Sequence, residues 1–157
     1  MFSHTIERYE QGGQELKDAI AGLSQTDLTA FPVPGTWSIQ QIVIHLVDSD
    51  LIGADRMKRI IAEDRPELLG YDQNRFVAAL FYQEQLIEDA VKIFDLNRRQ
   101  FARVLHRLPA EAFERTGTHS ERGVVTLGQQ LHGYCDHLDH HLNFVQQKRQ
   151  LLGKPLQ

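Results

Sequence analysis

Two of the eight histidines in this sequence, His137 and His141, are spaced four residues apart. That spacing places two imidazole rings one above the other on a single face of a helix, close enough to share a metal ion. On a helical wheel of residues 127–151, both positions fall inside the apolar arc. Buried imidazoles carry ring nitrogens that require partners. The pair therefore indicates either a metal site or two hydrogen-bonded histidines of the core.

A third histidine lies on a second predicted helix, over residues 38–63. His45 flanks the apolar arc of that helix, in a row with Ser49 and Arg56, so these two side chains can line a pocket beside it. Helical bundles build metal sites from side chains on facing helices. Three histidine ligands leave at least one position on the ion open to water or substrate, which is typical of a catalytic site. The alternative is that His45 closes the edge of the core and bonds a carbonyl group.

Other polar side chains can contribute to such a site. Asp48 and Asp50 lie within one turn of His45 and can orient its ring, although Asp48 also fits a surface carboxylate. Arg56 can bind an anionic substrate group or pair with a carboxylate. His119 lies in a predicted loop and can either reach the mouth of a pocket or remain solvated.

The single cysteine is not expected to take part. Cys135 lies about 160° around the helix from His137, so it points away from the proposed metal and is expected to be an inert buried thiol. One cysteine cannot form an intrachain disulfide, and a reducing, cytoplasmic compartment is the simplest expectation.

Charge and hydropathy exclude two classes of partner. The chain has 17 Lys and Arg against 21 Asp and Glu, a net charge of -4, and no basic stripe that would bind nucleic acid. No apolar run approaches the roughly 20 residues of a membrane span, and the N-terminal segment lacks the apolar core of a secretory signal. We expect a cytoplasmic protein with neither a nucleic-acid nor a membrane partner.

Helical periodicity dominates the sequence and predicts four long helices. They cover residues 3–22, 38–63, 84–107 and 127–151. Ser38 with Gln41, and Thr126 with Gln129, have the spacing of a capping box, in which each side chain bonds the other residue's backbone N–H. These pairs predict where the second and fourth helices begin.

The connection between the second and third helices is long for a bundle, at about 20 residues. It can cross the bundle and allow these two helices to run parallel. Residues 115–125 fit an exposed loop or a small hairpin, and strand signals are otherwise nearly absent. We therefore predict an all-α fold, with residues 1–157 forming a single four-helix-bundle domain.

Four segments of the chain resemble the DinB/YfiT-like family. They are WSIQQIVIHLVDS at 37–49, PELLGYDQNRF at 66–76, HSERGVVTL at 119–127 and YCDHLDHH at 134–141. The resemblance implies a four-helix bundle of up-down-down-up topology, with a long crossover between the second and third helices. It also implies a divalent metal, nickel or zinc, held by His45, His137 and His141, and frequent homodimers.

The chain departs from the family pattern at three places. His119-Ser120-Glu121 stands where the YfiT branch usually has His-Pro-Glu, Asp50 stands where a histidine is common, and Asp136 replaces a common aromatic. These differences bear on the identity of the substrate more than on metal binding.

The leading hypothesis is a divalent-metal-dependent enzyme that acts on a small-molecule electrophile. The metal would activate a water or a low-molecular-weight thiol, which makes the protein a hydrolase or a thiol S-transferase. Members of the family include both kinds. The alternative is a non-catalytic metal-binding or stress-response helical interaction module. A structural metal site of that kind has no open position and would require a fourth protein ligand.

Overall fold

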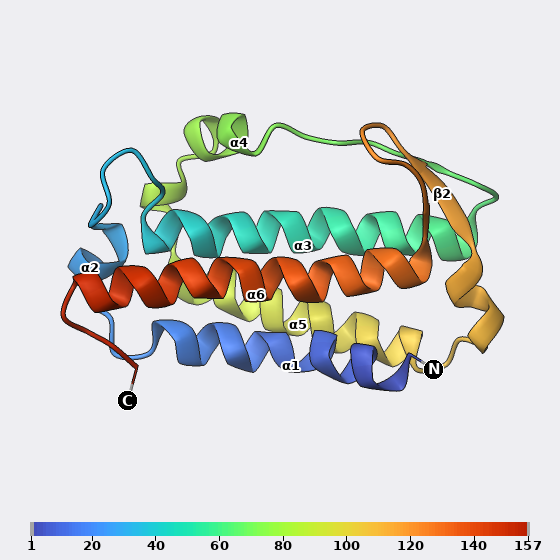
Figure 1. The fold of residues 1–157 in the computed structure, drawn as a ribbon, viewed down its shortest axis with the longest axis horizontal. Coiled ribbons are helices and arrows are strands. Elements are labelled where there is room, and N and C mark those ends of the chain that lie inside the picture. The colour runs from blue at the N-terminus through green and yellow to red at the C-terminus, as the bar shows by residue number, and fades with distance from the viewer. Residues whose placement is uncertain (1, 157) are drawn as a thin grey trace.

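Four long helices lie side by side in the computed structural model, which describes residues 2–156 (Figure 1). They are α1 (Ser3–Ile20), α3 (Ile39–Ala62), α5 (Ile87–Leu105) and α6 (Leu127–Leu151). Both α1 and α3 pack against α5 and against α6, so each helix has two close neighbours. The colours of Figure 1 show that α3 and α5 run in one direction, and α1 and α6 in the other. The predicted up-down-down-up order is confirmed.

Side-chain hydrogen bonds fix the starts of the two helices that carry the histidine triad. The Ser38 Oγ accepts the backbone N–H of Gln41 at 3.1 Å, and the Gln41 Oε1 accepts the N–H of Ser38 at 3.0 Å. Thr126 and Gln129 form the same reciprocal pair in front of α6. Each pair satisfies N–H groups that have no partner inside the helix. Both predicted capping boxes are confirmed.

The third long helix starts later than its periodicity predicts, at Ile87 rather than at residue 84. Tyr82–Glu84 forms the separate 3₁₀ turn η1. The Gln40 side-chain amide of α3 donates to the carbonyl oxygens of Tyr82 and Gln85, at 3.0 and 3.1 Å. These bonds hold Gln85 in an extended conformation, which a continuing helix does not allow.

Short elements fill the connections between the long helices. They are α2 (Gln25–Thr29), β1 (Glu67–Leu68), α4 (Gln73–Ala79), η2 (Ala110–Glu114), β2 (Thr116–His119) and β3 (Gly123–Thr126). The crossover that carries β1 and α4 runs along the outside of α3 (Figure 1). The predicted small hairpin is β2–β3, and β1 adds to it in parallel, with Leu68 opposite His119. A two-residue strand is too short to show alternation, so the sequence does not reveal β1.

The core between the helices contains two clusters of buried apolar side chains. One includes Leu46 and Phe94, and the other includes Met57 and Phe101. A buried ion pair, described below, interrupts the apolar packing of α3 and α5 between these positions. None of the helices within residues 2–156 is long and apolar enough to cross a membrane.

Candidate metal centre

Three histidine rings from two antiparallel helices meet inside the bundle. His45 comes from α3, and His137 and His141 come from α6. The Nε2 atoms of His45 and His137 lie 3.2 Å apart, and one ring nitrogen from each histidine lies within 4.8 Å of the other two. The three ring centroids are 4.6 to 5.1 Å apart. The fold therefore brings together the three histidines that the helical wheels select.

Burial keeps these rings uncharged. His45 is 1% exposed and His141 is 8% exposed. Burial first, and the neighbouring histidines second, lower the pKa of His45 and of His137 to about 4 and the pKa of His141 to about 3. All three imidazoles are neutral at pH 7, which is the form that binds metal ions.

The residues of the cluster fit a shared divalent ion. Two nitrogens that each lie about 2.1 Å from one ion are about 3–4 Å apart, close to the spacing found here. The Nδ1 atoms of His45 and His141 are buried without a hydrogen-bond partner among the described residues. Three neutral imidazoles are a donor set that suits zinc and nickel. Within residues 2–156, this triad forms a metal-binding constellation contributed by both α3 and α6.

Trp37 covers one side of the histidine cluster. Its ring is parallel to that of His141, with centroids 6.2 Å apart, and its centroid lies 4.9 Å from that of His45. An apolar cover limits the access of water to a metal site and lowers the local dielectric constant. Trp37 directly precedes Ser38, so the capping box of α3 fixes the backbone next to this residue.

Two cavities adjoin the cluster, and both are lined by His137 and Gln73. The smaller cavity, of about 230 Å³, is polar, and its other lining residues include His45, Ser49, Arg56, Tyr71, His119 and Gln130. The larger cavity, of about 720 Å³, has an apolar wall that includes Trp37, Ile42 and Phe144, and His141 also lines it. The histidines are therefore accessible from a polar and from an apolar compartment.

The side chains predicted to line a pocket are in the polar cavity. Ser49 and Arg56 reach it from α3, and His119 reaches it from the end of β2. The His119 ring is buried, and its Nδ1 accepts the backbone N–H of Glu121 at 3.2 Å. Burial, followed by the charges of Arg56 and Arg122, lowers the pKa of His119. His119 is therefore a neutral ring whose hydrogen bond at Nδ1 places its proton on Nε2.

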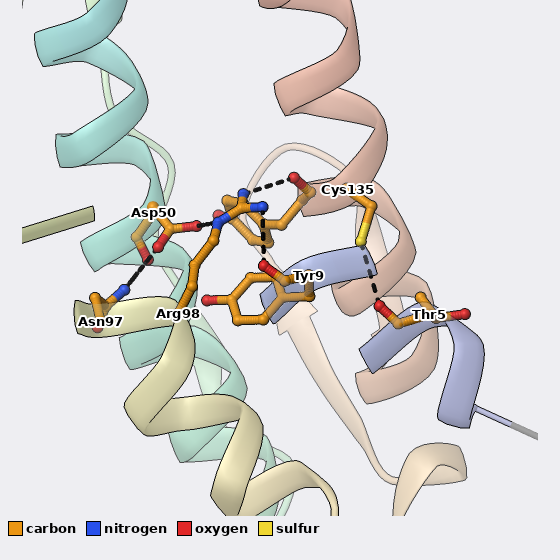
Figure 2. A network of polar contacts seen from close by, with 7 residues as sticks. Thr5, Tyr9, Asp50, Asn97, Arg98 and Cys135 are labelled. Atoms are coloured by element: carbon orange, nitrogen blue, oxygen red, sulfur yellow. Dashed lines mark hydrogen bonds and ion pairs between the residues drawn. The ribbon is translucent and has the colours of Figure 1, made fainter. Parts of the chain in front are cut away.

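Asp50 does not orient His45, and that prediction is wrong. Its carboxylate is 1% exposed and accepts a hydrogen bond from the Arg98 Nε at 2.9 Å (Figure 2). Five residues along α3 separate Asp50 from His45, which places the two side chains about 140° apart around the helix. Asp50 therefore faces α5. Asp48 also bonds elsewhere, since its Oδ2 accepts the Tyr82 hydroxyl at 2.5 Å.

Arg98 extends this buried network to α6. Its Nη2 donates to the carbonyl oxygen of Tyr134 at 2.9 Å, and its Nη1 donates to that of Tyr9 at 3.4 Å (Figure 2). The Tyr134 hydroxyl accepts a hydrogen bond from the Arg56 Nη1 at 3.2 Å. Tyr134 lies about one turn before His137, so it links the core network to the polar cavity.

Cys135 is separate from the cluster, as predicted. Its thiol donates to the carbonyl oxygen of Thr5 at 3.6 Å (Figure 2). Burial raises the pKa of Cys135 to about 11, so the thiol stays protonated and inert at neutral pH.

Tyr71 and Gln130 also line the polar cavity and are not among the residues predicted from the sequence. Gln130 is 2% exposed and lies seven residues before His137. Two helical turns separate them, so the heptad spacing could have placed Gln130 on the histidine face of α6. Tyr71 lies in the crossover, where no periodicity indicates which way a side chain points.

A sequence profile of the DinB superfamily matches residues 8–145. This chain belongs to the DinB superfamily. The match begins inside α1 and ends inside α6, so it includes parts of all four long helices and every histidine of the cluster.

Similar members of the superfamily are named for metal-dependent chemistry. A protein of Oceanobacillus iheyensis named "Putative metal-dependent hydrolase" is 28% identical over 130 residues, which are 83% of this chain and 75% of the relative. A protein of the same name from Bacillus cereus strain B4264 is 27% identical over 153 residues, or 98% of this chain and 88% of the relative.

A solved structure confirms the fold of this DinB-superfamily chain. YfiT from Bacillus subtilis superposes with a TM-score of 0.90 at 22% identity, covering 96% of this chain and 86% of YfiT. That protein is described as "a probable metal-dependent hydrolase with an unusual four-helix bundle topology". The superposition covers nearly the whole chain, so the two proteins share this arrangement of helices.

Proposed function

We propose that this chain is a metal-dependent enzyme, in which His45, His137 and His141 hold one zinc or nickel ion and a small electrophilic molecule is attacked beside it. The observation that carries the proposal is the convergence of three neutral imidazoles from α3 and α6 on one point, of which His45 and His141 are buried and His137 is half-buried. The names of the relatives support metal-dependent hydrolysis.

The number of protein ligands favours catalysis over a purely structural site. The constellation contains three histidines, and structural zinc sites usually have four protein ligands. When bound, a divalent ion supplies a Lewis acid that lowers the pKa of a coordinated water or thiol. Two cavities reach the same histidines, so there is space beside the site for a substrate.

The residues around the triad have distinct roles in this proposal. Trp37 limits the access of water from its side of the cluster and packs against His45 and His141. His119 is neutral, with its Nδ1 occupied by the N–H of Glu121, so its Nε2–H can donate a hydrogen bond to a substrate oxygen in the polar cavity. Such a donor stabilises negative charge that develops on that oxygen.

Elemental analysis tests the metal assignment. The wild type and the variants His45→Ala, His137→Ala and His141→Ala are purified without metal-affinity chromatography. His132→Ala is the control, because His132 is exposed and lies on α6 with His137 and His141. We expect about one equivalent of divalent metal in the wild type and the control, and a loss in the three other variants. Absence of metal from the wild type, even after incubation with zinc and nickel, would refute the proposal.

Two assays separate the choices of nucleophile. Activated aryl esters report attack by water, and a chlorinated aromatic electrophile with added cysteine reports attack by a thiol. Metal-dependent turnover in either assay, lost in His141→Ala, supports an enzyme of that type. One equivalent of tightly bound metal with four protein ligands would favour the interaction-module alternative.

A further inference from the structure

Arg56 is a buried cation without a counter-ion. Its side chain is 6% exposed, and no carboxylate oxygen of the described residues forms an ion pair with it. Its Nη1 donates to the neutral hydroxyl of Tyr134 at 3.2 Å, and its Nη2 donates to the carbonyl oxygen of Leu69. The Arg56 Nε is buried and has no hydrogen-bond partner within residues 2–156. Buried charges in proteins are normally paired, so this arrangement calls for an anion.

Two other buried arginines show how this chain satisfies such a charge when no ligand is involved. The Arg98 Nε is paired with the carboxylate of Asp50 at 2.9 Å. Arg149 lacks a carboxylate, but it donates to three backbone carbonyl oxygens, which leaves neither its Nε nor its Nη1 free. Arg56 has neither a carboxylate nor a full set of carbonyl partners, and it lines the polar cavity.

The cavity beside Arg56 has an excess of positive charge. Arg56 and Arg122 both line it, and Glu121 is the one acidic residue among its described lining residues. The positive charge also acts on His119, whose pKa is lowered first by burial and then by Arg56 and Arg122. Gln130 adds an unsatisfied acceptor, because its Oε1 is buried without a partner in the described part of the chain, and an O–H or N–H group of a ligand can donate to it. At about 230 Å³, the cavity suits a small ligand or one end of a larger one.

We propose that the polar cavity binds the carboxylate or phosphate group of a small organic anion, with Arg56 as its counter-ion. Arginine is suited to this role because its planar guanidinium directs several N–H donors at the oxygens of one anion. His45 and His137 line the same cavity, so the anion lies beside the histidine cluster. That the anion belongs to a substrate or cosubstrate rests on the function proposed above, whereas the binding itself does not.

Arginine side-chain NMR tests the proposal without requiring a substituted protein. The Nε–Hε signals of the full-length chain are followed during titration with sodium phosphate and, separately, with sodium acetate, before and after removal of metal by a chelator. We expect the Arg56 signal to shift in a saturable manner with at least one of the two anions, in both metal states. The anion that saturates at lower concentration identifies the preferred group. An Arg56 signal that moves no more than that of exposed Arg59 with either anion would overturn the proposal.

A pair of variants on one helix gives a second, independent measurement. Arg56→Gln removes the charge from the cavity, and Arg59→Gln removes a charge of the same sign that lies three residues further along α3 and pairs with Asp55 and Glu63. Calorimetric titration of the metal-free proteins is expected to show at least a tenfold loss of anion affinity in Arg56→Gln and no change in Arg59→Gln. Equal affinity in both variants would contradict the assignment. Because no metal is needed, this outcome is independent of the metal stoichiometry that tests the proposed function.

Discussion

The Nε2 atoms of His45 and His137 lie 3.2 Å apart although the two residues are separated by 92 positions in the sequence. They belong to antiparallel helices whose starts are fixed by equivalent capping boxes at Ser38 and Thr126. The approach of two neutral rings at this distance allows one hydrogen bond or one shared ion. A metal ion that binds only the native state stabilises it. Binding of an ion between these two rings can therefore be measured as a gain in stability.

We expect zinc to raise the thermal stability of the metal-free protein. At a free zinc concentration 100-fold above Kd, the gain is about 2.7 kcal/mol, which corresponds to roughly 5–10 °C in Tm for a chain of this size. His45→Ala removes the ligand from α3 and should abolish the rise, whereas His132→Ala should keep it. Differential scanning calorimetry with and without zinc checks this, and a full rise in His45→Ala would exclude the three-histidine site.

Removal of Arg98 should strongly destabilise the bundle. Arg98→Met leaves the Asp50 carboxylate buried without its partner and leaves the Tyr134 carbonyl without its donor. Breaking a buried pair in this way costs about 3–5 kcal/mol. Urea denaturation measures the loss. The double variant Asp50→Leu with Arg98→Met should recover part of it, and a double variant as unstable as the single one would show that the charge left behind is not the cause.

Two glycines make a matched pair on facing helices. A Cβ built at Gly53 of α3 would overlap with the ring of Tyr134, whereas one built at Gly133 of α6 meets no atom within 4 Å. Gly53→Ala should therefore destabilise the protein by about 1–3 kcal/mol through overpacking. Gly133→Ala should stabilise it by about 0.5–1 kcal/mol, because alanine loses less backbone entropy in a helix. Chemical denaturation of both variants checks the opposite signs, and two changes of the same sign would contradict the described packing.

Asp95 should contribute to stability at neutral pH but not in acid. Burial alone would raise its pKa, but the hydrogen bonds from Lys17 and Arg99 prevail and lower the pKa of Asp95 below its usual value. The unfolded chain, with a carboxyl pKa of about 3.9, therefore binds the proton first as the pH falls. The contribution is complete above that pH and is lost as the pH falls through the folded-state pKa.

The variant Asp95→Asn measures this contribution. Its urea midpoint should lie below that of the wild type at pH 7, and the difference should shrink below pH 4. A difference that stays constant down to pH 3 would mean that the ion pairs of Asp95 do not cause it.

The sequence alone predicts most of the fold because its signals are local. Ser38 and Thr126 each form a capping box within three residues, and the apolar stripes of the long helices repeat every three to four residues. The start of the third helix is set instead by the contact of Gln40 with a turn more than 40 positions away. No local pattern reveals this long-range contact. β1 is likewise defined by its pairing with the distant β2, which no local pattern reveals.

The residues of the candidate site also fall into those that local sequence patterns predict and those that they do not. The helical faces of His45, His137 and His141 follow from spacing, so the wheels predict that they meet. The nearness of Asp50 to His45 in the sequence suggests a contact, but the angle of Asp50 around the helix directs it to Arg98. The nature of the thiol, the homodimer and the cytoplasmic location stay predictions.

The division of the histidines between α3 and α6 also affects when the site can form. Because His137 and His141 both lie on α6, His45 meets its partners only after that helix has been synthesised and has docked. A nascent chain on the ribosome that lacks α6 offers a single ligand, and α6 alone offers two. Closing so long a loop is entropically costly and slow. Capture of a metal ion by the triad would therefore be a late event in biogenesis, and it would report that α6 has reached its place.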